Sequence, residues 1–222
     1  MVEVSKSPLK PPQRRPSAAR RTHRSYHHGD LRRALLEEAV RTIGAQGIEA
    51  LTLRKVGRRL GVSRTALYRH FADKSSLLAA VAREGFVEFR NDLLEAWNGE
   101  GGGQAGFEAM GIAYVRFALR NPSYYRVMFG GFRDLCAKDP ELEATATAAF
   151  RVLVDALASL SARDIRPDEF DQLARFNWAV VHGVAMLGID GQLGPDPTAA
   201  DSLVRFGIER MRAALLHAST VS

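Results

Sequence analysis

The amino-acid sequence predicts an all-α protein of about nine helices, and three observations support this fold class. Apolar residues recur every three or four positions along most of the chain, which is the spacing of one helix face. Glycine and proline separate these segments, as they do at helix ends. No segment alternates apolar and polar residues convincingly, as a half-buried strand does. With 222 residues, 46% of them apolar, the chain can bury a sizeable core.

The first three helices are expected close to the N-terminus. The first begins at Asp30 and is stopped by Gly44 and Gly47, and the next two cover 53–60 and 64–71. Thr52 and Ser63 are residue types that cap the starts of these two short helices. Apolar residues at helical spacing form the inner faces of the three helices: Leu31, Leu35, Ala39, Ile43, Leu53, Val56, Leu60, Ala66, Leu67 and Phe71.

The turn between the two short helices has a distinctive composition. Gly61 suits the left-handed backbone that such a tight turn often needs. Val62 has the size to fill the angle between the helices, and Gly57 allows them to approach closely. The sequence therefore predicts a helix-turn-helix whose second helix is 64–71.

Six more helices follow in the predicted order. The fourth is long, because it begins at Asp73 or Lys74 and continues to about Trp97, where the glycine-rich stretch 98–103 ends it. The others are expected over 104–120, 122–129, 139–163, 167–189 and 198–217.

Charge is distributed unevenly along the chain. Residues 1–29 carry a net charge of +6, residues 30–75 carry +5, and residues 76–222 carry −5, which favours a polyanionic partner for the first third. Residues 1–27 are rich in proline, lysine and arginine, so we expect a disordered basic arm that either contacts DNA or remains a solvated tail. The expected domains are the arm, the helix-turn-helix domain, and an effector-binding and dimerisation domain, over 1–27, 28–74 and 75–222.

Several classes of protein lack support in the sequence. Cys136 is the single cysteine, so no intrachain disulfide is possible, which suits the cytoplasm. The longest near-apolar run, 176–189, has 14 residues, whereas a membrane span needs about 20. Phosphate-binding loops, nucleophile elbows and clusters of metal ligands are absent from the sequence. We therefore expect a cytoplasmic protein that has no catalytic site, metal or cofactor and does not bind membranes.

The outer face of helix 64–71 carries many hydrogen-bonding side chains. At 1.5 Å per residue this helix is about 12 Å long, comparable to the width of the major groove of DNA. Arg64 and Thr65 lie at its N-terminal end, where recognition helices contact base edges. The alternative is an ordinary three-helix domain with a polar face. The residues expected to contact DNA are Thr52, Ser63, Arg64, Thr65, Tyr68, Arg69, His70 and Lys74.

A close resemblance to the DNA-binding signature of the tetracycline-repressor (TetR) family is carried by LTLRKVGRRLGVSRTALYRHFADKSSLLAAV, residues 51–81. It extends over roughly 35–81. Gly57 departs from the family pattern, in which alanine is usual, but both residues are small and only helix propensity is lost. The matching features are Thr52, Val56, Gly61-Val62-Ser63, Leu67-Tyr68, His70-Phe71, Lys74 and Leu77-Leu78.

A shorter resemblance continues in the C-terminal half. NPSYYRVMFG (121–130) and WAVVHG (178–183) are similar to the C-terminal domain type named for its Trp-His-Gly (WHG) motif, which implies regulation and dimerisation. Helix 167–189 is apolar on most sides, so one side can face a partner subunit, unless both final helices only close a monomeric core. The residues expected at a dimer interface are Val180, Val184, Leu187, Leu203, Val204, Gly207, Met211 and Leu215.

Aromatic residues and methionines are frequent between the fourth helix and the helix at 167–189. Such mixtures line adaptable apolar pockets, so the set fits an effector cavity, although core packing is the more common role for any one of these residues. His182 lacks a second histidine or cysteine at metal-ligand spacing, which favours a packed histidine over a ligand. The residues expected around an effector are Phe86, Phe89, Tyr114, Phe117, Tyr124, Tyr125, Met128, Phe129, Phe150, Trp178, His182 and Met186.

These observations predict a ligand-responsive transcriptional regulator. The resemblance implies a homodimer that represses by binding a palindromic operator in double-stranded DNA and is released by a small hydrophobic effector. The alternative is a non-specific architectural DNA-binding protein that acts through its arm and basic face. An enzyme is disfavoured because the sequence lacks a phosphate loop, a nucleophile elbow and a metal cluster. The acidic pair Asp168-Glu169 lies at a predicted helix start, where it complements the helix dipole.

Overall fold

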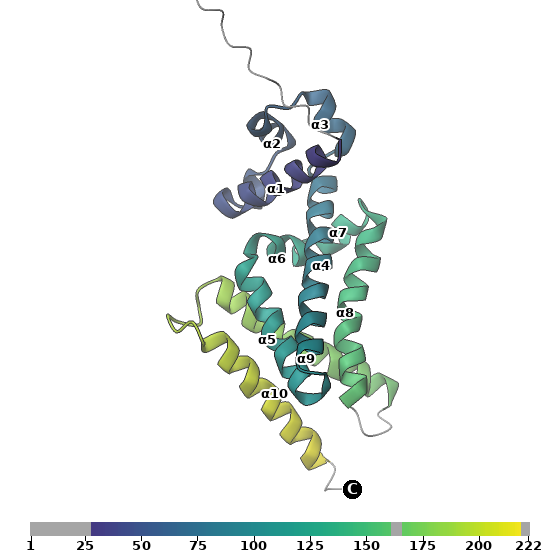
Figure 1. Ribbon diagram of the computed structural model, residues 1–222, viewed down its shortest axis with the longest axis vertical. Helices are drawn as coiled ribbons and strands as arrows, with labels where there is room; N and C mark the ends of the chain where they lie inside the picture. The colour runs from purple at the N-terminus through teal and green to yellow at the C-terminus, as the bar shows by residue number, and fades with distance from the viewer. Residues whose placement is uncertain (1–27, 161–165, 219–222) are drawn as a thin grey trace, which may run out of the picture.

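The computed structural model describes the backbone of residues 28–160 and 166–218, and the side chains of residues 31–160 and 166–210. All regular elements in these ranges are helical, as the sequence predicted (Figure 1). The predicted basic arm, 1–27, lies outside the described residues. The elements are α1 (His28–Gln46), the 3₁₀ helix η1 (Ile48–Ala50), α2 (Leu53–Leu60), α3 (Arg64–His70), α4 (Lys74–Gly99), α5 (Gly103–Arg120), α6 (Pro122–Phe129), α7 (Phe132–Cys136), α8 (Pro140–Leu160), α9 (Pro167–Ile189) and α10 (Ala199–Ala218).

Helices α2 and α3 form the predicted helix-turn-helix on top of α1. Gly61 ends α2 in the left-handed conformation, with φ of 66°. The peptide N–H of Val62 donates to the carbonyl oxygen of Gly57 over 3.0 Å, which closes the turn. A Cβ atom on Gly57 would lie 3.1 Å from Cδ2 of Leu67, so this glycine allows close packing of the two helices. The geometry matches the role that the sequence predicted for the Gly57 and Gly61 pair.

A buried carboxylate joins α1 to α2. Glu38 is only 2% exposed, and its Oε1 accepts a hydrogen bond of 2.9 Å from Nη1 of Arg59. The hydroxyl of Thr42 donates to the same oxygen over 3.3 Å, and Arg41 pairs with the second oxygen. A buried charge is tolerated only when it is paired and hydrogen-bonded, and Glu38 satisfies both conditions. The network therefore fixes the position of α2 on α1.

The long helix α4 begins directly after α3 and connects the helix-turn-helix to the remaining helices. Its first turn is held by a capping box: the N–H of Ser76 donates to Oδ1 of Asp73 over 2.7 Å, and the N–H of Asp73 donates to Oγ of Ser76 over 3.1 Å. The hydrogen bond from Ser76 lowers the pKa of Asp73, and the nearby Lys138 acts in the same direction. Lys138 lies 3.3 Å from this carboxylate, and Arg83 lies 3.0 Å from Asp139. These ion pairs tie the start of α4 to the segment between α7 and α8.

A second connection runs through α6. A Cβ atom on Gly44, near the end of α1, would lie 3.0 Å from Oγ of Ser123 in the first turn of α6. Since α6 also packs on α4, the helix-turn-helix is joined to the rest of the protein by both α4 and α6.

Helix α4 runs through the middle of the C-terminal part, with α5 and α8 against it and α9 and α10 outside α5 (Figure 1). The sequence predicted nine helices, and the described ranges contain a tenth α-helix, α7. It is separate because Gly131 adopts a φ of 72° and starts a new five-residue helix after α6. None of the helices in the described ranges is long and apolar enough to cross a membrane.

Candidate DNA-binding face and apolar cavity

Helix α3 lies at one end of the molecule (Figure 1). Arg64, Thr65 and Arg69 are exposed, and Tyr68 is 40% exposed. The guanidinium of Arg64 lies 5.5 Å from the centre of the Tyr68 ring, a cation–π contact that orders both side chains at the helix surface. No carboxylate among the described residues pairs with Arg64 or Arg69, so both guanidinium groups are available for an external partner.

The two capping residues also present hydroxyl groups on this side of the molecule. Oγ1 of Thr52 accepts the N–H of Lys55, and Oγ of Ser63 accepts the N–H of Ala66, each over 3.2 Å. A hydroxyl that accepts one hydrogen bond keeps its own proton to donate. Both side chains are exposed, so each can cap its helix and donate to a phosphate at once.

The last two residues expected to contact DNA are half-buried. His70 ends α3, and Lys74 begins α4 with its Nζ 3.8 Å from the carboxylate of Glu49. The Glu49 side chain is almost fully exposed, so this pair is weak and Lys74 is free to exchange it for a phosphate.

Two further arginines on α2 complete the basic surface. Arg54 and Arg58 are exposed and, within the described ranges, have no ion pair. Their spacing of four residues, which places them on one helix face, was the signal in the sequence that could have identified them.

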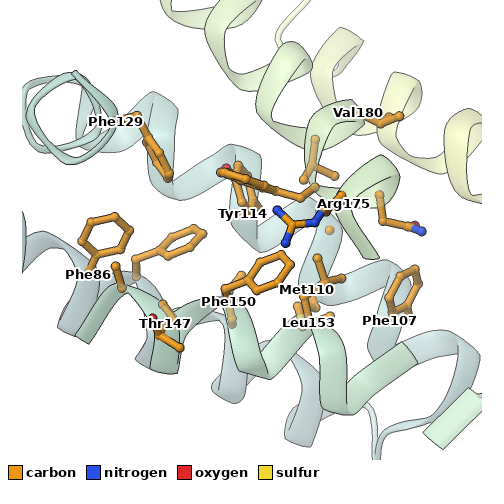
Figure 2. A pocket seen from close by; sticks show the side chains of 18 of the residues that line it. Phe86, Phe107, Met110, Tyr114, Phe129, Thr147, Phe150, Leu153, Arg175 and Val180 are labelled. Atoms are coloured by element: carbon orange, nitrogen blue, oxygen red, sulfur yellow. The ribbon is translucent and has the colours of Figure 1, made fainter. Parts of the chain in front are cut away.

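A cavity of about 460 Å³ lies in the C-terminal part (Figure 2). Its volume falls within the range of small-molecule sites. Six of the residues expected around an effector line it: Phe86, Phe89, Tyr114, Phe129, Phe150 and Trp178. The other lining residues are Leu93, Phe107, Met110, Gly111, Phe132, Glu143, Ala146, Thr147, Ala149, Leu153, Arg175, Asn177, Val180, Val181, Val204 and Ile208.

A buried cluster of polar groups lies beside the cavity. The hydroxyls of Tyr114 and Tyr125 are 2.9 Å apart, and the Tyr125 hydroxyl is 2.7 Å from Nδ1 of His182. The indole N–H of Trp178 donates to the Tyr114 hydroxyl over 3.1 Å. The Tyr114 hydroxyl accepts from both Trp178 and Tyr125, and the Tyr125 oxygen can in turn accept the Nδ1–H of a neutral His182. Burial lowers the pKa of His182, which favours this neutral form.

Comparison with known proteins identifies the family of this chain. The family described as "Bacterial regulatory proteins, tetR family" matches residues 35–81, and "Tetracyclin repressor-like, C-terminal domain" matches residues 107–211. The chain belongs to the TetR family. Its members are DNA-binding transcriptional regulators, not enzymes. The C-terminal match spans both segments in which the sequence resembled a family regulatory domain.

Three individual proteins are similar to this chain. An uncharacterized HTH-type transcriptional regulator of Mycobacterium tuberculosis, Rv0681, is 26% identical over 191 residues, covering 81% of this chain and 82% of the relative. The HTH-type transcriptional repressor AcnR of Corynebacterium diphtheriae is 36% identical over 75 residues, covering 28% of this chain and 40% of AcnR. A solved structure from Rhodococcus sp. RHA1, of unknown function, has a TM-score of 0.71 and 31% identity, covering 84% of this chain and 96% of that one.

The remaining residues expected around an effector do not line the cavity. Tyr125 and His182 belong to the polar cluster and are connected to the cavity through Tyr114, which lines it. The Tyr124 hydroxyl donates to Glu84 over 3.1 Å. Phe117 and Met128 are buried, and Met186 is half-buried. Residue type suggested this set, whereas lining depends on which face of each helix turns toward the cavity.

Helical spacing could have identified some of the lining residues that were not predicted. Phe107, Met110 and Gly111 lie on the same face of α5 as Tyr114, three to seven residues before it. No comparable signal exists for Arg175, because a charged residue in an apolar helix normally indicates the solvated side.

The residues expected at a dimer interface fall into three groups. Val180 and Val204 line the cavity, Val184 is buried, and Gly207 packs against Val180 within the same chain. Leu187 and Leu203 are exposed, by 41% and 39%. The side chains of Met211 and Leu215 lie outside the described residues. Two exposed aromatic residues that were not predicted extend the apolar surface of α9 and α10, Phe176 (55% exposed) and Phe206 (54% exposed).

The polar cluster makes stability depend on pH. Because the pKa of His182 is lowered in the folded protein, the unfolded chain takes up this proton first as the pH falls. The contribution of His182 is fully present above about pH 6.5 and is lost as the pH falls from there toward the lowered pKa. We expect the Tm of the wild type to fall by about 1–3 °C more than that of His182→Asn between about pH 7.5 and 5.5. Thermal unfolding followed by circular dichroism measures this difference, and parallel curves for both proteins would contradict the assignment.

Proposed function

We propose that this protein is a dimeric, ligand-responsive repressor. It binds a palindromic operator through α3 of each subunit and is released when a small apolar effector enters the cavity. Such a regulator acts on DNA in the cytoplasm and needs no metal or cofactor. The observation that carries this proposal is the path of α4, which starts just after α3 and lines the cavity through Phe86, Phe89 and Leu93.

The exposed face of α3 supports the DNA-binding part of the proposal. Arg64 and Thr65 occupy the first turn, from which a recognition helix contacts base edges. Thr52, Ser63 and Lys74 surround that turn with phosphate donors, and Arg54 and Arg58 extend the positive surface. This division assigns sequence choice to α3 and affinity to its surroundings.

Helices α9 and α10 support the dimer. Phe176, Leu187, Leu203 and Phe206 are large apolar side chains that remain exposed on these two helices. Exposed apolar residues that gather on neighbouring elements mark an interface between proteins. Two identical surfaces pack around a two-fold axis, and that symmetry presents both copies of α3 to a palindrome.

Effector control requires that the effector bind more tightly to the state that cannot hold the operator. Two elements connect the cavity to the helix-turn-helix. One is α4, and the other is α6, which places Phe129 in the cavity wall and Ser123 against Gly44 of α1. A ligand that displaces either helix moves α3 relative to its two-fold copy.

The proposal is tested by filling the cavity. Ala146 lines the cavity and Ala144 is exposed on the same helix, so Ala146→Phe and Ala144→Phe add the same ring to the inside and the outside. Gel-shift titration with an operator selected from random DNA measures affinity, and a panel of apolar compounds of differing charge identifies effectors. We expect equal operator affinity for all three proteins and release of the operator from the wild type and Ala144→Phe only.

Two results would contradict the proposal. Operator affinity that no compound in a broad panel changes would argue against effector control. A full response of Ala146→Phe would show that the effector acts outside this cavity. Overpacking a core costs about 1–3 kcal/mol, so we expect Ala146→Phe to remain folded. An unfolding temperature within a few degrees of the wild type would show that its lost response to the effector is not caused by unfolding.

A further inference from the structure

The cavity lining is mostly apolar but includes two charged residues. Among the described lining residues, Glu143 and Arg175 are the only charged ones. The lining residues of α8 extend from Glu143 to Leu153, which corresponds to about 15 Å along the helix. Figure 2 shows Arg175 on the side of Met110 and Leu153, with Phe86 and Phe129 toward the opposite side. The lining is therefore elongated along α8, and its positive charge lies at Arg175, between Phe86 and Phe129 on one side and Phe107 and Val180 on the other (Figure 2).

Arg175 has hydrogen-bond donors that are not used within the described part of the chain. Its Nε donates to Oδ2 of Asp171, one turn earlier on α9, over 2.7 Å. Both Nη groups have no partner among the described residues, and the side chain is 63% exposed. A carboxylate at this position would accept two hydrogen bonds and stay partly hydrated, which avoids the cost of burying a charge.

The interior has little to offer a polar headgroup. Trp178 donates to the Tyr114 hydroxyl within the polar cluster, and Nδ2 of Asn177 donates to the carbonyl oxygen of Leu173 over 2.8 Å. Apart from Met110 and the exposed Thr147, the remaining wall is formed by aromatic and aliphatic residues and glycine, and a negative headgroup at the far end would meet the carboxylate of Glu143. These features select a ligand with an apolar body and a negative charge at one end.

We propose that the cavity binds an elongated apolar carboxylic acid, with its carboxylate on the Nη groups of Arg175 and its chain along Phe150, Phe129 and Phe86. Arg175 is then the residue that selects acids over neutral or cationic compounds of the same length. The role of this acid as an effector rests on the proposed function, whereas its binding does not.

The experiment compares three compounds with the same ten-carbon chain: decanoate, decanol and decylamine. Titration calorimetry on the full-length protein at about pH 7.5, below micelle-forming concentrations, measures binding without DNA. The carboxylate is ionised under these conditions and the amine is protonated. We expect decanoate to bind the wild type at least about tenfold more tightly than decanol or decylamine, as hydrogen bonds to charged groups imply.

Arginine variants identify the source of the preference. We expect Arg175→Gln to bring decanoate to the affinity of decanol and to leave decanol unchanged. Arg166→Gln removes the same charge from the start of α9, outside the cavity, and is expected to behave as the wild type. An equal or greater affinity for decylamine or decanol in the wild type, or an unchanged acid preference in Arg175→Gln, would overturn the proposal.

Failure of the two proposals can be distinguished. Release of the operator by a cation or a neutral compound, without selective acid binding, would support the proposed repressor function and contradict the proposal that the cavity selects a carboxylic acid. Selective acid binding with no effect on DNA would preserve the acid site and reject effector control.

Discussion

Replacing Arg64 with alanine is expected to reduce the preference for the operator over random DNA by about 5- to 150-fold, which corresponds to the loss of about 1–3 kcal/mol from one bidentate contact to guanine. The exposed guanidinium lies in the first turn of α3 and has no ion pair with any described residue. Its removal leaves no buried group unpaired, so the Tm should change little. The loss should be confined to operators that carry the preferred base at the contacted position.

Competition gel shifts separate this effect from general weakening. Lys74→Ala is the matched control, because Lys74 is placed to contact phosphate and its loss should weaken operator and random DNA equally. If the Arg64→Ala protein prefers the same sequence as the wild type, Arg64 does not contact a base. A wild type that prefers its operator over random DNA by much less than about 10³-fold would favour the architectural alternative.

Replacing Phe206 with aspartate is expected to convert the dimer to monomers and to weaken operator binding by about a hundredfold or more. Phe206 is 54% exposed on α10, so the change does not disturb the core of the subunit. In a dimer interface, the same carboxylate would be buried without a partner, which is strongly unfavourable. Monomers lose the gain in affinity that comes from binding two half-sites at once.

Analytical ultracentrifugation measures the subunit equilibrium, and gel shifts measure operator affinity. Val87→Asp is the matched control, since Val87 is also a large exposed apolar residue (47%) but lies on α4. It should remain a dimer with wild-type affinity. A dimeric Phe206→Asp protein would place the interface elsewhere, and a monomeric variant with full operator affinity would contradict recognition by two subunits.

Local signals in the sequence were sufficient for the helix-turn-helix. Thr52 and Ser63 cap their helices, and Gly61 turns the backbone as expected, because these roles depend on residues within four positions. The short helix α7 was not predicted, because five residues are too few to show a helical period. The end of α4 before a run of glycines followed from the local sequence in the same way.

Only some of the residues that line the cavity could be predicted from the sequence. Tyr114 and Tyr125 are the same residue type on successive helices, yet Tyr114 lines the cavity and Tyr125 is fully buried behind it. The difference arises from how α6 packs against α4 and α5, which no local pattern encodes. Arg175 was missed for a similar reason: its charge predicts a solvent-exposed position, whereas its place on α9 also brings it to the cavity.

The contact between Gly44 and Ser123 limits how this regulator can be re-engineered. A side chain at 44 would place its Cβ atom 3.0 Å from Oγ of Ser123 on α6, so Ser123 would have to shift if a foreign DNA-binding domain without this glycine were joined to the C-terminal part. Chimeras designed with a junction inside α4 alone would overlook it. A hybrid that keeps glycine at position 44 preserves the close packing of α1 of the imported domain against α6.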